Sequence, residues 1–192
     1  MDYEDLSTFP EFKWVEFFWV TSAKLPAWAG YQIRRGPYGS LSANGRSDGT
    51  VRIIFAPEGR GEGSLSNEEI RLVKWLIDNQ TSVHDATLKR LFEEYPAMRE
   101  RWLGWFNDDE ANEVLPDIRF SNQLKDIVGI SSIIVHPIEQ DGRPFIGVEL
   151  GCTWEAEHGV GILLHGDNPL EIGGADTAIT LWIAKKYLSN QS

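Results

Sequence analysis

The sequence is poor in the residues that build disulfides, metal centres and membrane spans. Its 192 residues include one cysteine, Cys152, and four histidines. A lone cysteine forms no internal disulfide, and the chain has no CxxC pair or Cys/His array of the kind that binds structural zinc. No run approaches the roughly 20 apolar residues of a membrane helix, and the first residues are acidic, unlike those of a signal peptide. We therefore expect a soluble, cytoplasmic protein that packing alone stabilises.

Positive charge is also scarce. Eighteen Lys and Arg residues face 29 Asp and Glu, which leaves a net charge of −11. Proteins that bind nucleic acids or anionic membranes neutralise phosphates with basic patches, so this balance argues against both partners. It is compatible with a basic protein partner, although solubility is the more common reason for such an excess. The glycine-rich stretch at residues 59–63 lacks the Lys-Ser/Thr of a phosphate loop and indicates a flexible linker, and we expect no cofactor.

The first sixty residues predict strands. Three segments rich in aromatic and β-branched residues, Phe12–Val20, Ala29–Gly36 and Thr50–Gly59, are separated by Pro, Gly, Ser and Asn. Between the last two lie Asn44-Gly45 and Asp48-Gly49, dipeptides typical of hairpin turns. This part of the chain should form an antiparallel meander.

From Ser66 the apolar residues recur at helical spacing. Ser66 and Glu69 have the spacing of a capping box, so one helix should run from about Asn67 to Asp78. A second helix, capped by Thr81 or Ser82, should be interrupted at Pro96.

A short third helical segment should then present Met98, Trp102, Trp105 and Phe106 to the core, because their spacing is that of a buried face. The acidic run at residues 107–113 lacks the pattern of a calcium loop, and we expect a solvated loop there.

The C-terminal part predicts hairpins and a last helix. Ser131–Gln140 and Arg143–Cys152 flank Asp141-Gly142, and a two-residue turn there sets Val135 opposite Val148. The segment Thr177–Leu188 has helical spacing, with lysines near its end. Together these elements predict one α+β domain over residues 1–192, with a central helical pair packed on an antiparallel sheet.

Most residues that could do chemistry lie between Gly151 and Ala178. Apolar residues alternate on both sides of the polar loop at residues 155–159, which indicates a hairpin. In the next hairpin, a three-residue loop at Gly166–Asn168 would set Leu164 opposite Leu170 and Ile162 opposite Ile172. The same register would place His158 beside Asp176.

Three interpretations of this region are open. Cys152, His158 and Asp176 have the residue types of a nucleophile, a base and its orienting group, although Cys152 falls on the apolar face of its strand. Glu155 or Glu157 with His158 and Asp176 could bind a metal ion, in a pattern looser than HExxH. The third and simplest interpretation is structural, with Asp176 orienting His158 and the glycines allowing tight turns.

The pattern WEAEHGVG at residues 154–161, followed by GGADTA at residues 173–178, resembles the signature of an uncharacterised bacterial family. In that signature Trp, two acidic residues and His-Gly precede Gly-x-Ala-Asp, and Glu155 stands where family members often carry aspartate. The order of strands and helices is similar over most of the chain. The resemblance implies a fold type and no established activity.

Two hypotheses of function follow. The first is a non-enzymatic protein-binding factor of immunity or regulatory type, since small acidic proteins of this general kind accompany toxins. Its binding residues would be Trp154, Glu155, Glu157, His158 and Asp176. The second is a hydrolase-like or metal-dependent enzyme centred on His158 and Asp176, with Glu157 as a further catalytic or metal-binding candidate.

Overall fold

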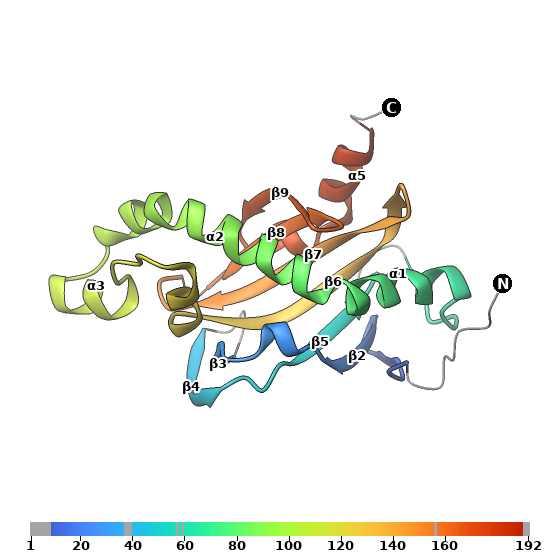
Figure 1. The fold of residues 1–192 in the computed structure, drawn as a ribbon, viewed down its shortest axis with the longest axis horizontal. Coiled ribbons are helices and arrows are strands. Elements are labelled where there is room, and N and C mark those ends of the chain that lie inside the picture. Colours follow the sequence, from blue (N-terminus) through green and yellow to red (C-terminus); the bar gives the residue numbers. More distant parts are fainter. Residues whose placement is uncertain (1–8, 37–39, 57, 59, 156, 190–192) are drawn as a thin grey trace.

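A seven-stranded sheet forms the centre of the molecule. The computed structural model describes residues 9–36, 40–56, 58, 60–155 and 157–189, and only the backbone of residues 42–44. In the sheet the strands follow the order β1-β2-β5-β6-β7-β8-β9. Helices α1 and α2 lie along one side of it, and α5 projects near the C-terminal end (Figure 1). The predicted α+β class is confirmed.

The sheet consists of two antiparallel parts joined by one parallel pair. The strands are β1 (Lys13–Val15), β2 (Phe18–Lys24), β5 (Thr50–Phe55), β6 (Val128–Gln140), β7 (Arg143–Cys152), β8 (Val160–His165) and β9 (Asn168–Gly173). Strands β5 and β6 run parallel, with Ile53 opposite Ile133. Since parallel neighbours need a crossover connection, the helical elements lie between them: α1 (Asn67–Asp78), α2 (Gln80–Leu103), α3 (Asp108–Val114) and the 3-10 helix η4 (Ser121–Asp126).

The N-terminal strands do not form the simple meander expected. The segment Phe12–Val20 is not one strand but holds β1, a turn at residues 16–17 and the start of β2, and Glu16 has a positive φ of 57° in the turn. After the short 3-10 helix η2 (Pro26–Trp28), strands β3 (Gln32–Arg35) and β4 (Leu41–Arg46) pair in a separate two-stranded sheet. Asn44-Gly45 lies inside β4 and makes no turn, and Asp48-Gly49 connects β4 to β5 without forming a hairpin, because these strands belong to different sheets.

The central strands are buried on both faces of the sheet. Ile133 and Val135 of β6 belong to the main core, on the side of α1 and α2. Ile134, between them, packs with Ile54 and Ala178 on the opposite face. Strands covered on both faces read as continuous apolar runs rather than as alternating ones, which is the pattern of β6, β7 and β8.

Helix α1 has the predicted bounds, and two other helical predictions were wrong. Ser66 and Glu69 form both hydrogen bonds of the capping box. Helix α2 continues through Pro96, because Tyr95 and Leu91 before it and Met98 and Trp102 after it pack against the same core. The expected acidic loop is helix α3, whose Asn107 and Glu110 form a second capping box. Within the described residues, no helix combines the length and the apolar character needed to cross a membrane.

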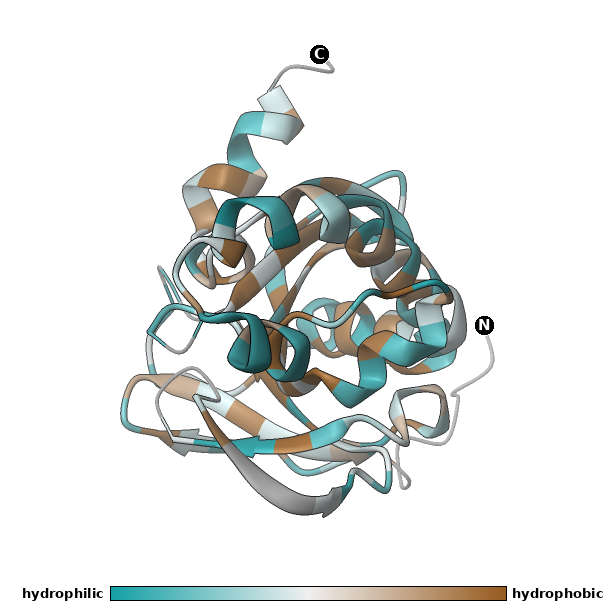
Figure 2. Cartoon of the chain, turned by 90° about the vertical axis from the view of Figure 1, so that its left-hand side faces the viewer, coloured by the Kyte–Doolittle hydropathy of each residue, from teal (hydrophilic) through white to brown (hydrophobic). Residues whose placement is uncertain are grey.

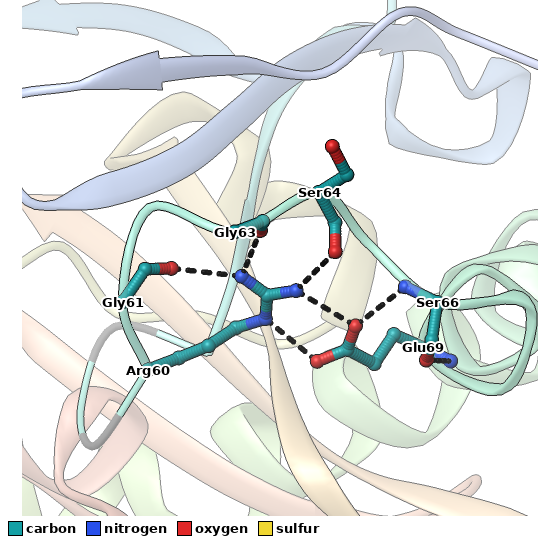
Figure 3. Close-up of polar contacts among 6 residues, drawn as sticks. All are labelled: Arg60, Gly61, Gly63, Ser64, Ser66 and Glu69. Atoms are coloured by element: carbon teal, nitrogen blue, oxygen red, sulfur yellow. Dashed lines mark hydrogen bonds and ion pairs between the residues drawn. The ribbon is translucent and has the colours of Figure 1, made fainter.

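The loop before α1 is organised by the guanidinium group of Arg60 (Figure 3). It donates hydrogen bonds to the carbonyl oxygens of Gly61, Gly63 and Ser64 and to both carboxylate oxygens of Glu69. The hydrogen bond from Arg60 lowers the pKa of Glu69 to about 2, which keeps the capping carboxylate ionised at neutral pH. Composition predicted a linker here, and of its residues Gly59 lies outside the described part of the chain.

The β6–β7 hairpin has the predicted turn and a different register beyond it. Gln140 pairs with Arg143 across the Asp141-Gly142 turn. An irregularity between Val135 and Glu139 then shifts the pairing, so Ile133 and not Val135 faces Val148. This shift is even, and because side chains alternate with a period of two it leaves Ile133 and Val135 on their expected face. A second irregularity, between Ile130 and Ser132, shifts the pairing by one residue, so that Ile130 and not Ile133 faces Leu150.

The predicted terminal helix is divided into two helices, and a buried histidine holds the first of them. Thr180 has extended backbone angles between α4 (Asp176–Ile179) and α5 (Leu181–Ser189). His136 of β6, fully buried, donates from Nε2 to the carbonyl oxygen of Ala178 at 3.0 Å. Glu58 accepts a hydrogen bond from the backbone N–H of Leu181 at 2.8 Å. These two side chains satisfy backbone groups that so short a helix leaves open.

Replacing Ser66 by Ala should lower the free energy of unfolding by roughly 1 kcal/mol, because the backbone N–H of Glu69 loses its acceptor. The measurement is chemical denaturation of both proteins. Ser189→Ala is the matched control, since Ser189 lies at the exposed end of α5. A denaturation midpoint equal to that of wild type, with an unchanged slope, would contradict the role of the cap.

Acidification should destabilise the protein through His136. Burial lowers the pKa of His136 to about 4 from its usual 6.5, so between these values the unfolded chain binds a proton that the folded protein does not. Stability should therefore fall as the pH drops from about 6.5 to 4, by roughly 3 kcal/mol for this group. Denaturation of wild type and His136→Gln at pH 7 and pH 4 measures the difference. An equal loss in both proteins would contradict the assignment to His136.

Candidate functional site

The two signature segments line a cleft beside helix α2. One wall consists of α2 side chains, among them Glu94, Met98, Arg101 and Trp102. The other consists of Trp154, Glu155 and residues 159–160 and 172–174. The enclosed space is about 180 Å³, and we call it the α2 cleft. Of the candidate residues predicted from sequence, the structure places Trp154 and Glu155 in its wall.

Trp154 is a fixed part of this wall. Only 3% of its surface is exposed, and its ring lies 5.5 Å from that of Tyr95, edge to face. The hydroxyl group of Tyr95 donates to the carbonyl oxygen of Pro116 at 2.8 Å. Aromatic pairs in this geometry contribute beyond the area that they bury, so Trp154 is anchored to α2 and to the segment after α3.

Glu155 holds the loop that carries the other polar candidates. Its Oε1 accepts hydrogen bonds from the backbone N–H groups of Glu157 and His158, at 2.9 and 3.2 Å. Its Oε2 lies 3.3 Å from Nδ1 of His158. The Glu155 side chain is 16% exposed, whereas that of His158 is 67% exposed. Glu155 therefore belongs to the cleft and shapes the loop, while Glu157 and His158 point into solvent.

His158 and Asp176 are not the cross-strand pair that the register predicted. Ile162 does face Ile172, but an irregularity after Leu163 sets Leu164 opposite Pro169 and shortens the loop to Gly166-Asp167. At the other end β9 stops at Gly173, and Asp176 begins α4. A backbone hydrogen bond connects the loop before β8 to the start of α4 instead, since the N–H of Ala175 donates to the carbonyl oxygen of His158 at 3.2 Å.

The glycines of the signature let α4 lie directly on the sheet. A Cβ added to Gly161 would come within 2.4 Å of the carbonyl oxygen of Gly174, and one on Gly147 within 1.9 Å of that of Ala178. A Cβ on Gly173 would meet the hydroxyl oxygen of Thr177 at 2.5 Å. Real side chains do not approach backbone so closely, so these three positions form a glycine floor under residues 174–178. The sequence predicted that the glycines allow tight turns, and at these three positions they allow close packing instead.

Cys152 is buried in the main core with no exposed surface. Burial raises the pKa of its thiol to about 12. Because the thiolate is the nucleophilic form, Cys152 is protonated and enclosed at neutral pH. The prediction that it lies on the core face of its strand is confirmed, and the nucleophile interpretation loses its support.

The described residues also contain no group of three or more His, Cys, Asp or Glu side chains placed to hold one metal ion. A different set of titratable groups lies far from the cleft, where the hydroxyl of Tyr31 is 3.0 Å from Nε2 of His84 and Nδ1 of His84 is 2.8 Å from Asp85. Burial raises the pKa of Tyr31 and lowers that of His84. Since Tyr31 is 1% exposed, this chain joins the N-terminal half to α2 and meets no solvent at the tyrosine.

The sequence did not indicate that the residues at the end of α2 form an exposed surface. Trp105 follows the last residue of α2 and was expected in the core, yet 78% of it is exposed. Its ring centroid lies 6.2 Å from that of Trp102, which lines the cleft. Helical spacing identifies one face of a helix but does not show where the core beneath it ends, and this information was absent from the pattern.

Comparison with known proteins gives a family and no activity. The model of a family described as a domain of unknown function (DUF6985) matches residues 31–179. Neither the curated proteins nor the solved structures contain a match to the chain. The expectation of a family without an established activity is confirmed.

Gly161→Ala should be strongly destabilising, because its methyl group would displace the backbone of residues 174–178. We expect a loss of about 1–3 kcal/mol, as for other overpacked sites. Gly174→Ala is the matched control, since a Cβ there would meet no atom within 4 Å. Thermal and chemical denaturation of the two variants measure the contrast. Equal stabilities would show that α4 does not depend on the glycine floor.

Proposed function

We propose that the chain, which belongs to the family of the domain of unknown function DUF6985, is a cytoplasmic protein-binding factor of regulatory or immunity type. Its partner is a basic protein, and no catalytic step is assigned to it. The observation that carries this proposal is the exposed Trp105 at an acidic end of the molecule. We define the Trp105 surface as Trp102, Trp105 and the α3 carboxylates Asp108, Asp109 and Glu113.

The aromatic part of this surface has the properties of a binding anchor. Trp105 is 78% exposed, so water covers most of a large apolar ring. It stands against Trp102, which restricts its freedom before any partner arrives. Tryptophan is among the residues most often found at binding hot spots, because one ring buries a large area at a small cost in side-chain entropy.

The charged part of the surface indicates the sign of the partner. Asp108, Asp109 and Glu113 are all exposed on α3, directly after Trp105. Figure 2 faces this end of the molecule and shows α3 as a largely hydrophilic helix. With a net charge of −11 over the whole chain, the field around this surface attracts a basic protein and repels an acidic one.

The experiment captures the partner beside Trp105 and then measures its affinity. A photo-crosslinking amino acid replaces Asn112, which is exposed on α3 and leaves Trp105 in place, and the protein captured in the source cell is identified and purified. Titration against wild type and Trp105→Ala should then show a loss of affinity of about thirtyfold or more, as for an interface hot spot. Neutralising Asp108, Asp109 and Glu113 together should slow association and weaken its dependence on salt.

Trp182→Ala is the matched control, because Trp182 is 65% exposed on α5, away from this surface. It should bind the partner as wild type does. The proposal is overturned if the captured protein binds Trp105→Ala and wild type equally, if it is acidic, or if position 112 captures no protein.

A further inference from the structure

The α2 cleft adjoins the Trp105 surface and has a chemistry of its own. Trp102 belongs to both, since it lines the cleft and contacts Trp105. The cleft is about 180 Å³, which is the scale of one large side chain and not of a folded segment. Whatever occupies it while a partner covers Trp105 must therefore be a single projecting group.

Apolar and aromatic atoms make up the two sides of the cleft. Trp102 and Met98 lie on the α2 side, with Trp154 and Ile172 across from them. These side chains suit the methylene groups of a long side chain. The half-buried indole ring of Trp102 also suits a planar cation, which stacks on aromatic faces and is held by their electron density, whereas Trp154, 3% exposed, adds only a small surface to the wall.

Two carboxylates complete the lining. Glu155 has 16% of its side chain exposed and is held in place by the N–H groups of Glu157 and His158. Glu94 lies on the opposite wall, 35% exposed, with its Oε1 bonded to Arg90 at 2.8 Å. A fixed carboxylate that is partly withdrawn from water forms stronger, more directional bonds to a guanidinium group than an exposed one does.

We propose that the α2 cleft is a recognition pocket for one arginine side chain of the basic partner. The methylene groups lie against Met98 and Ile172, and the guanidinium group lies on the indole ring of Trp102 and donates to Glu155. This inference rests on the proposed function for its biological meaning, but the pocket itself is testable without any partner. Arg101, exposed at the rim of the cleft, carries the same charge as the ligand and weakens its binding.

The probe is N-acetyl-arginine amide, titrated into the full-length protein while the indole N–H signals are followed by NMR. N-acetyl-citrulline amide, which replaces the guanidinium group by a neutral urea, is the matched control, and N-acetyl-lysine amide tests the preference for a planar cation. We expect binding in the millimolar range for so small a ligand, with shifts at Trp102 and Trp154. The citrulline and lysine compounds should bind more weakly.

Variants of the lining residues should change the affinity for the arginine compound in opposite directions. Glu155→Gln keeps an oxygen that accepts the two backbone N–H groups and removes only the charge, so it should fold and bind the arginine compound about tenfold more weakly. Glu94→Gln provides a second test on the other wall, with the same direction. Arg101→Gln should strengthen binding by about twofold, since a like charge is removed. Trp182→Ala, on α5 and outside the cleft, should bind the compound as wild type does.

Several outcomes would overturn the inference. They are equal binding of the arginine and citrulline compounds, tighter binding of the lysine compound, no shift at Trp102 and Trp154, or no effect of the two glutamate variants. Failure here is distinguishable from failure of the proposed function, because the compound is titrated without any partner and the crosslinked partner is tested by Trp105→Ala. A partner that binds Trp105 while the arginine compound does not bind leaves the proposed function standing and removes the pocket.

Discussion

Direct contact between backbone and backbone, at the place where α4 lies on the sheet, is the constraint on which the arrangement of the C-terminal half depends. Gly147, Gly161 and Gly173 leave no room for a side chain beneath residues 174–178. Because α4 is only four residues long, its own hydrogen bonds satisfy few of its backbone groups. His136 and Glu58 supply partners from two other elements, so the sheet, the loop after β5 and the terminal helices are positioned together.

The same contact explains why the signature residues occur close together in sequence. The carbonyl oxygen of His158 accepts a hydrogen bond from the N–H group of Ala175. Gly161 has no side chain and so leaves room for the backbone above it. Glu155 holds the intervening loop, and Trp154 fixes that loop to α2 through Tyr95. Most of the motif thus builds structure, and the residues with chemical potential line the cleft or lie in solvent beside it. A motif rich in His, Glu and Asp is therefore no evidence of catalysis by itself.

Local interactions were predictable from the sequence, and those that depend on the tertiary context were not. The Ser66 capping box and the Asp141-Gly142 turn are set by neighbouring residues, and both are found as predicted. Pro96 looked like a helix end, but packing on both sides of it outweighs the missing hydrogen bond. The predicted pairing of His158 with Asp176 is lost because β9 ends at Gly173 and α4 begins at Asp176, and no sequence pattern identified this break.

The candidate site was predictable in part for the same reason. Trp154 and Glu155 were identified because they stand in the dense polar stretch, and both line the cleft. The opposite wall was not identified, because Met98 and Trp102 have the spacing of core residues and are half-buried. Residues that pack on the core and residues that also border a cleft have the same helical spacing, so the spacing does not distinguish the two roles. Asn107-x-x-Glu110 is different, since this second capping box was present in the sequence and was overlooked.

The parallel pair of β5 and β6 also has a kinetic consequence. Hairpins such as β6–β7 and β8–β9 close over two-residue loops, whereas Ile53 meets Ile133 only after the whole helical segment between them has been enclosed. The entropy lost on closing a loop grows with its length, and contacts distant in sequence slow folding. We therefore expect the three residue pairs of this joint to form late in the assembly of the sheet. Until they form, the edges of β5 and β6 are open to pairing with other chains.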